Sequence, residues 1–245
     1  MLVQLAVLGA FLTLPLSVHA DEPKAIIEKA VRAHGGEARL LKVEFVRTKS
    51  KGTIETNGVT VAVVIESVSQ LPTRLRTVHE FDIMGQRQSV ITVCDSGKAW
   101  QMRGSATEDI TGARLDEVRQ TLHARRIESL LPLVKEAGFE LSGVADIDVN
   151  GKPAVGVKVA TKGLRDCTLY FDKDTGLLVR LTRKTLDLNQ QEADTETTYS
   201  AWKDFDGLKL PTKLLVQQAG KKLLEAEITE CKFPDKVDPG EFLKP

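Results

Sequence analysis

The chain has 245 residues, enough for one or two domains, and its 34 lysines and arginines balance 34 aspartates and glutamates. Formal neutrality argues against non-specific nucleic-acid binding, which depends on clustered basic residues in excess. A content of 42% hydrophobic and 28% charged residues excludes a largely disordered chain, and 5% aromatic residues leave little for stacking bases or sugars.

Residues 1–20 predict a signal peptide that is not part of the fold. Residues 2–18 are almost entirely apolar, and the tripeptide that ends at Ala20 has the small-x-small pattern of a cleavage site, so that Asp21 becomes the new N-terminus. The stretch contains a proline and is short for a bilayer span. It has no lysine or arginine before the apolar run, so an uncleaved anchor stays as the alternative. We expect an exported, periplasmic protein.

A short helix and then a series of strands are predicted next. Residues 25–33 place apolar side chains on one side of a helix, which Gly35-Gly36 ends. From residue 43 to residue 102 the pattern changes to short β-rich runs with alternating apolar residues, separated by turns such as Asn57-Gly58.

One long helical stretch interrupts the strands. Residues 115–134 keep an apolar stripe, and Pro132 should kink or divide this helix. A second series of strands opens at Asn150-Gly151, with turns at residues 172–176, 204–207 and 219–220. The absence of a parallel β-α-β rhythm favours a mainly β (α+β) chain of about eleven antiparallel strands in one curved sheet or barrel.

Several strands are apolar on both faces, so the second face needs a cover. Ala62 and Val64, for example, alternate with Val61, Val63 and Ile65. The helix predicted within residues 115–134 is long enough to lie in the concavity of a curved sheet and bury both apolar surfaces. Two interpretations stay open: the helix completes a static core, or it moves and exposes an apolar groove.

The three cysteines, Cys94, Cys167 and Cys231, leave at least one thiol unpaired, and the sequence does not choose among the possible pairs. Cys94 and Cys167 lie in apolar runs typical of strands, where a cysteine usually acts as a small buried hydrophobe. The sequence favours three free thiols, with one disulfide as the alternative.

Catalytic constellations are not evident in the sequence. His34, His79 and His123 fall on three predicted elements and are expected at the surface or at helix ends. Zinc-binding and nucleophile-elbow motifs are missing from the sequence. Asp172 and Asp174 suggest a calcium loop, but the closing glutamate is missing and the same residues make a good hairpin turn. The sequence therefore predicts a non-enzymatic protein without metal or cofactor.

Ordered segments along the mature chain carry a family resemblance. In residues 71–76 a proline precedes arginines at alternate positions, and an Asp-Ser-Gly-Lys turn at residues 95–98 leads into Trp100. The further segments are residues 88–93, 150–154, 169–172 with 175–177, 206–212 and 242–245. Together they resemble the outer-membrane lipoprotein carrier (LolA/LolB-like, lipoprotein-sorting) superfamily. Ser96, inserted between Asp95 and Gly97, departs from the carrier pattern.

The resemblance implies one LolA-like domain over residues 21–245: an open half-barrel whose concave apolar face binds acyl chains under a helical lid. It implies an exported carrier or chaperone of a lipid or lipidated protein, and leaves room for a membrane acceptor protein as a second partner. We expect a monomer that binds no nucleic acid. The alternative is a non-enzymatic envelope interaction protein that uses the same fold with a closed core.

The resemblance also assigns site residues. The groove is lined by Val61, Val63, Ile65, Leu177 and Val179, its edge is capped by Trp100, and the lid stripe is Leu115, Val118 and Leu122. For all of these an ordinary core role is the alternative, and either face of the strands qualifies as the inner one. Arg74 and Arg76 are expected to hydrogen-bond a loop carbonyl or a lipid head group, or else to be surface charges that limit edge-to-edge pairing.

Overall fold

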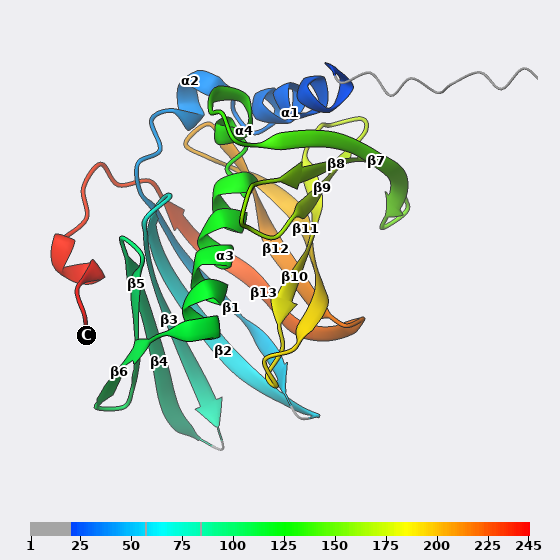
Figure 1. The fold of residues 1–245 in the computed structure, drawn as a ribbon. Helices are drawn as coiled ribbons and strands as arrows, with labels where there is room; N and C mark the ends of the chain where they lie inside the picture. Colours follow the sequence, from blue (N-terminus) through cyan, green and yellow to red (C-terminus); the bar gives the residue numbers. More distant parts are fainter. Residues whose placement is uncertain (1–20, 57, 84) are drawn as a thin grey trace, which may run out of the picture.

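The computed structural model describes residues 21–56, 58–83 and 85–245 (Figure 1). The predicted signal peptide with its cleavage residue Ala20 lies outside the described residues, as do the turn residues Asn57 and Met84. Asp21, the expected new N-terminus, is the first residue of helix α1 (Asp21–Ala33).

The described residues form thirteen strands, in two series separated by helices. The first series is β1 (Val46–Thr56), β2 (Val59–Gln70), β3 (Arg74–Ile83), β4 (Gln86–Asp95), β5 (Lys98–Arg103) and β6 (Ala106–Ile110). The second is β7 (Glu140–Val149), β8 (Lys152–Ala160), β9 (Cys167–Asp172), β10 (Leu178–Leu186), β11 (Glu192–Phe205), β12 (Leu208–Gln218) and β13 (Lys221–Lys232). The other helices are α2 (Glu37–Leu40), α3 (Gly112–Glu128), α4 (Leu131–Lys135) and the 3-10 helix η1 (Pro239–Phe242).

All thirteen strands belong to one open antiparallel sheet in the order β6-β5-β4-β3-β2-β1-β13-β12-β11-β10-β9-β8-β7. This confirms the predicted fold class, with thirteen strands instead of about eleven. The two additional strands, β6 and β7, are the edge strands of the sheet. Most of their residues are exposed, β6 is short, and the larger apolar residues of β7 recur every third position (Leu141, Val144, Ile147) across a register shift, so the two-residue alternation of the inner strands is weak in them.

The predicted turns and helix ends are confirmed. Helix α1 ends just before Gly35 and Gly36, both at positive φ, where the amide of Gly36 donates to the carbonyl of Val31 over 2.9 Å. The predicted long helix is divided in two, because α3 ends at Glu128 and Pro132 stands in the first turn of α4. Asp172 Oδ1 accepts hydrogen bonds from the backbone amides of Asp174 and Thr175, as expected for a hairpin turn.

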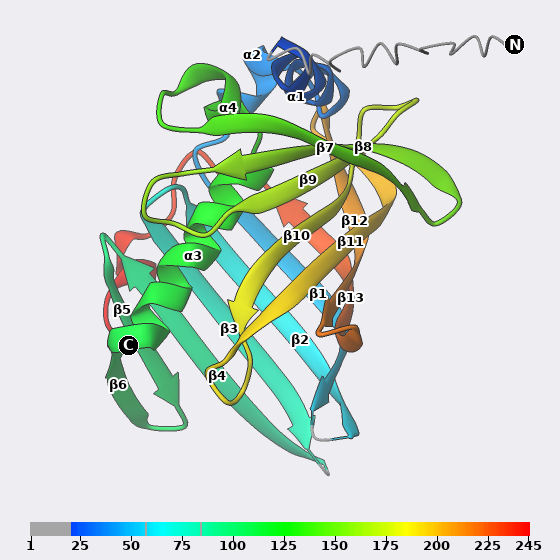
Figure 2. The same cartoon turned by 45° about the vertical axis from the view of Figure 1, so that its right-hand side comes forward.

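Helix α3 crosses the concave side of the sheet (Figures 1 and 2). Its residue Leu122 packs into a cluster with Leu75, Cys94, Ala99 and Ile110 of β3–β6. A larger core joins α1, α3 and α4 to β8–β11; Ile27, Ile127, Leu169 and Phe171 are among its members. On the convex side the C-terminal segment covers a third cluster, of Phe45, Val68, Val93 and Phe242.

Cys94, Cys167 and Cys231 are free thiols in the structure, as the sequence favours. Cys94 and Cys167 are buried, and burial raises the pKa of the Cys167 thiol to about 12. The expected surface position of the histidines is wrong for His34 and His123, each only 7% exposed. His34 does follow a helix end, but the packing of α1 on the sheet buries it.

The two series of strands are joined where β1 pairs with β13. Gly52 on β1 faces Ala226 on β13, and a Cβ at Gly52 would lie 2.7 Å from Ala226 Cα and closer still to the carbonyl oxygen of Glu225. Glycine therefore permits the close approach of the two strands at this seam.

Gly52→Ala should lower the free energy of unfolding by about 1–3 kcal/mol, because the added methyl group overpacks the seam against backbone atoms. Urea denaturation of this variant and of Lys51→Ala, which truncates an exposed neighbour on the same strand, measures the effect. Equal stabilities of the two variants would contradict the close approach.

His34 links α1 to the sheet in its neutral form. Its Nδ1 donates to the carbonyl of Ala30 over 2.7 Å, and its Nε2 faces the amide of Leu178 at 3.5 Å. Burial lowers the pKa of His34. In the unfolded chain this side chain takes up a proton near pH 6.5, whereas in the folded protein it does so only at lower pH.

The free energy of unfolding should therefore fall as the pH drops below about 6.5, and should fall less in His34→Gln, which cannot be protonated. Urea denaturation of both proteins at pH 7.5 and pH 5.5 makes the comparison. If the two proteins lose the same stability over this interval, His34 is not the group that titrates.

Candidate functional site

A cavity of about 830 Å³, here called the main cavity, lies between helix α3 and the concave face of the sheet. Its lining comes from β1–β6 on one side, called the first wall, from β10–β13 on the other, called the second wall, and from α3 above. Figure 2 shows the helix spanning the opening between these two walls.

The last two strands supply a continuous part of the apolar lining of the main cavity. The residues concerned are Leu210, Leu214, Leu224, Ala226 and Ile228. Sequence reasoning did not select them as site residues. The alternation of Leu224, Ala226 and Ile228 with the charged Glu225 and Glu227 is the signal that identifies this face of β13.

Polar side chains are interspersed with apolar ones on the other surfaces of the main cavity. Strands β1–β4 contribute hydroxyl side chains: Thr48, Ser50, Ser67, Thr77 and Thr92. Helix α3 presents charged and polar side chains at helical spacing: Arg114, Glu117, Thr121, Arg125 and Glu128. The lining of the main cavity is therefore mainly apolar, as expected for the groove, with hydroxyl and charged side chains set among the apolar residues.

The structure decides which face of β2 is the inner one. Ile65 lines the main cavity, and Val61 and Val63 lie on the same face because side chains alternate along a strand. Val63 is buried, with 3% of its surface exposed, but it does not line the cavity. A role of these residues in lipid contact stays a prediction.

The expected lid stripe lies on the sheet-facing side of α3. Leu115, Val118 and Leu122 all pack against the cluster that includes Leu75 and Ile110, and Val118 also lines the main cavity. These three residues hold the helix on strands β3–β6 of the first wall through apolar contact.

Trp100, Arg74 and Arg76 lie on the convex face of the sheet, away from the cavity and the helix. Trp100 packs against the cluster of the C-terminal segment, and the Arg74 guanidinium lies 5.7 Å from the ring centroid of Phe242. Arg74 Nε donates to Asp95 Oδ1 over 3.0 Å. Arg76 pairs across strands with Val68 and Val93, which belong to the convex cluster. The expected placement at the groove is corrected, because the inward residue of this strand is Leu75.

Leu177 and Val179 lie at the start of β10, outside the part of that strand that lines the main cavity. Leu177 is buried and follows Gly176, whose Cα lies close to Lys29 and Ala33 of helix α1. Val179 is at a bulge between β9 and β10. Neither residue lines the main cavity, so the structure does not bring them together with Ile65.

Polar contacts tie α3 to the second wall. Glu117 Oε2 accepts a hydrogen bond from Arg165 Nη1 over 2.6 Å, and the backbone amide of Leu186 lies 3.3 Å from the same oxygen. Gln120 Oε1 accepts from the amide of Arg165 over 2.9 Å. The helix is therefore held by apolar contact on both sides, since Ala124 and Ile127 pack into the core with β8–β11, and by ion pairs and hydrogen bonds in addition on the second side.

A group of buried charges lies where α3 ends. Burial raises the pKa of Glu128 and lowers that of Arg125, while each side chain partly offsets the shift of the other through opposite charge. Tyr199 hydrogen-bonds to Glu128, and burial raises the pKa of the tyrosine. Arg125, Glu128 and Tyr199 all line the main cavity.

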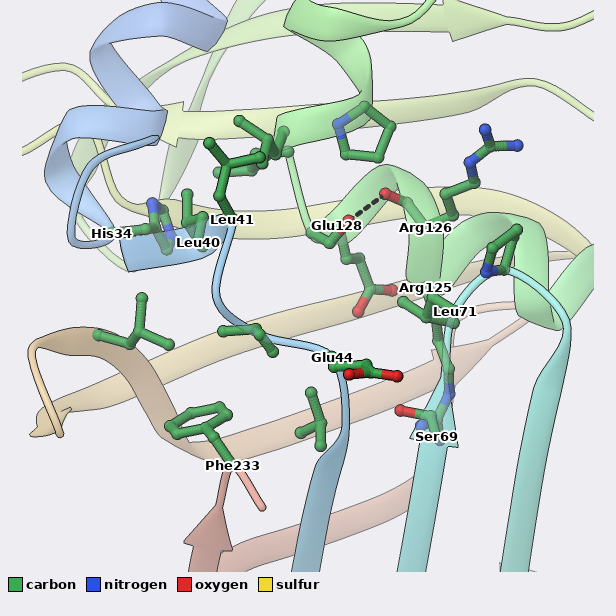
Figure 3. A pocket seen from close by; sticks show the side chains of 18 of the residues that line it. His34, Leu40, Leu41, Glu44, Ser69, Leu71, Arg125, Arg126, Glu128 and Phe233 are labelled. Carbon is green, nitrogen blue, oxygen red and sulfur yellow. Dashed lines mark hydrogen bonds between the residues drawn. The ribbon is translucent and has the colours of Figure 1, made fainter. Parts of the chain in front are cut away.

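A second, smaller cavity of about 410 Å³, the upper cavity, lies next to helices α2 and α4 (Figure 3). Leu40, Leu41, Leu71 and Phe233 give it apolar walls. Figure 3 shows Glu128 reaching from α3 toward the side on which Glu44 lies. The two cavities have four lining residues in common, namely Val46, Arg125, Glu128 and Leu210, so they adjoin at the buried charges.

Two further properties concern the described residues only. Across residues 21–56, 58–83 and 85–245, none of the helices has the length and apolar character needed to cross a bilayer. Among the same described residues, no group of three or more histidine, cysteine, aspartate or glutamate side chains is placed so that it could bind a metal ion.

The fold is shared with solved proteins of low sequence identity. A domain from Vibrio parahaemolyticus described as outer membrane lipoprotein-sorting is 9% identical, with a TM-score of 0.56 over 91% of this chain and 97% of its own. A LolA superfamily protein from Nitrosomonas europaea is 9% identical, with a TM-score of 0.54 over 88% and 95% of the two chains. A DUF1329 family protein from Desulfovibrio piger is 13% identical, with a TM-score of 0.58 over 90% and 97%.

No protein-family model and no curated protein sequence matches the chain. The structural matches show that the chain has the fold of LolA-superfamily and lipoprotein-sorting domains. The resemblance seen in the sequence is thereby confirmed for the fold.

Glu117→Gln should loosen α3, because the neutral amide loses the charge-assisted bond to Arg165, which lies in a half-buried setting. A loss of about 1 kcal/mol in local stability corresponds to roughly fivefold faster amide hydrogen exchange within residues 112–128.

Asp116→Asn is the matched control, because Asp116 is 65% exposed and forms an ion pair within the helix, with Arg119. Its exchange should stay within about twofold of the unsubstituted protein. Equal exchange rates in the two variants would show that Glu117 does not fasten the helix.

Proposed function

We propose that this protein is an exported, periplasmic carrier that holds a lipid, or the acyl chains of a lipidated protein, between helix α3 and the concave face of the sheet. The observation that carries the proposal is the main cavity of about 830 Å³, enclosed by one helix in a fold of the LolA superfamily. Its volume falls within the range of about 300–1,000 Å³ that is common for ligand sites.

The energies of the two competing interactions support binding under the helix. Burying an acyl chain against Leu214, Leu224 and Ile228 gains about 0.8 kcal/mol for each CH₂ group. The ion pairs between α3 and the second wall are partly exposed and contribute modestly, so the attachment there comes mainly from the apolar contacts of Ala124 and Ile127. Burial of the acyl chain of a common lipid can therefore offset the free energy that is lost when the contacts of the helix are broken.

The alternative of a closed-core interaction protein requires side chains packed densely beneath the helix. The volume under α3 and the hydroxyl residues of β1–β4 that face it favour a carrier. The proposed role needs neither catalysis nor a cofactor. Its partners are the lipid or lipidated protein and, for delivery, a membrane acceptor protein, and the carrier acts as a monomer.

Protein purified under mild conditions should carry lipid that native mass spectrometry detects, and Ile65→Glu should lose it. The substitution places a carboxylate in the lining of the main cavity, where desolvation makes it unfavourable beside an acyl chain.

Val64→Glu is the matched control, because the neighbouring residue of β2 points to the opposite face of the sheet. It should keep the bound lipid. Protein that is free of lipid before and after reconstitution with phospholipid vesicles, or equal loss in both variants, would contradict lipid carriage in this cavity.

A further inference from the structure

Arg183 on β10 is an arginine with an unused donor at the main cavity. Its side chain lines the cavity and is 18% exposed. Its Nη1 is buried and has no hydrogen-bond partner among the residues that the structure describes. A buried donor without an acceptor costs free energy, so a ligand that supplies an oxygen there gains a strong interaction.

The nearest carboxylate is already engaged. Arg183 Nη1 is 3.7 Å from Glu117 Oε1, which is beyond hydrogen-bonding distance. Glu117 is bound by Arg165 through Oε2 at 2.6 Å. Arg165 in turn meets Glu192 at 2.9 Å, and Glu192 is 52% exposed and does not line the cavity. Glu117 therefore lies between two arginines: it accepts a hydrogen bond from Arg165 and does not reach Arg183.

The other charges of the cavity lining are balanced locally. Arg114 donates to Glu108 and Gln101, each over 2.9 Å. Asp187 Oδ1 accepts from the backbone amides of Asn189 and Gln191. Arg125 and Glu128 lie near each other with opposite charges. Arg183, whose charge also acts on Glu128, is thus the lining cation with a buried guanidinium nitrogen that none of the described residues accepts from.

The register leads from Arg183 through Thr195 to Gln218, and the apolar wall lies further along the same strands. Arg183 pairs with Thr195 on β11, and Tyr199 of the same strand pairs with Leu214 on β12. Leu214 pairs with Ala226 on β13. A polar end at β10 and an apolar surface on β12 and β13 therefore share one cavity, the arrangement that an amphiphile requires.

We propose that the main cavity binds an amphiphile with an anionic oxygen head, a carboxylate or a phosphate, which accepts hydrogen bonds from Arg183 while its chain lies along β12 and β13. The inference rests on the proposed function and specifies the ligand of that same cavity. Arginine suits such a head because its planar guanidinium presents several charged donors to carboxylate or phosphate oxygens.

Three probes with one common chain test the head group: oleate, oleyl phosphate and oleyl alcohol, each titrated calorimetrically at pH 7.5 below the concentration at which it aggregates. The anionic probes should bind about tenfold or more tightly than the alcohol, because a hydrogen bond to a charged group is stronger than one between neutral groups. Preference for oleate or for oleyl phosphate then distinguishes a fatty-acid head from a phospholipid-type head.

Arg183→Gln should lose the preference for the anionic probes while binding oleyl alcohol with unchanged affinity. Lys184→Gln is the matched control: it removes the same charge from the next residue of β10, which is 58% exposed. This control should keep the preference. The comparison of probes on the unsubstituted protein remains decisive if Arg183→Gln does not fold.

The outcomes separate the two proposals. Equal affinity for all three probes in the unsubstituted protein overturns the head-group inference and leaves lipid binding in place. Binding of none of them overturns both. A preference lost equally in Arg183→Gln and Lys184→Gln would come from the overall charge and would overturn the assignment to Arg183.

Discussion

The architecture depends on the pairing of β1 with β13. These strands lie far apart in the sequence, and their hydrogen bonds join two hairpin series into one continuous sheet. The close approach at Gly52 and Ala226 belongs to this seam. Without it, the hydroxyl-lined strands of the first series and the apolar strands β12 and β13 would not face one cavity. The seam is a long-range contact, so the cavity forms only when the whole chain has folded.

Helix α3 connects the two walls by interactions of different kinds. Leu115, Val118 and Leu122 pack on the first wall, and Glu117 reaches Arg165 beside the second. Apolar contact is insensitive to salt, whereas partly exposed ion pairs are screened by it. Salt therefore weakens only the ionic part of the attachment on the second side, where Ala124 and Ile127 also pack into the core. An opening there would expose the apolar strands and Arg183 together, since both lie on the second wall.

Much of the fold follows from local patterns. Paired turn residues such as Asn150-Gly151 and the two-residue alternation of Val155, Val157 and Val159 define the strands, because both act over a few residues. The edge strands β6 and β7 escaped prediction since β6 is short and the apolar residues of β7 do not alternate every second position. The alternation in β13 identifies the apolar face of this strand in the sequence. Only the structure shows that this face lines the main cavity beneath α3.

The sequence by itself determined the strands, their turns, the covering helix and the resemblance to a carrier fold. The tertiary structure alone decided which face of each strand is the inner one. Alternation separates two sets of side chains without saying which set faces the concavity, since the pattern is the same in both cases. Here the helix covers one face and the C-terminal segment the other, so that Leu75 points inward while Arg74 and Trp100 point outward. The contacts with these two segments, which are distant in the sequence, therefore decide which face of each strand is the inner one.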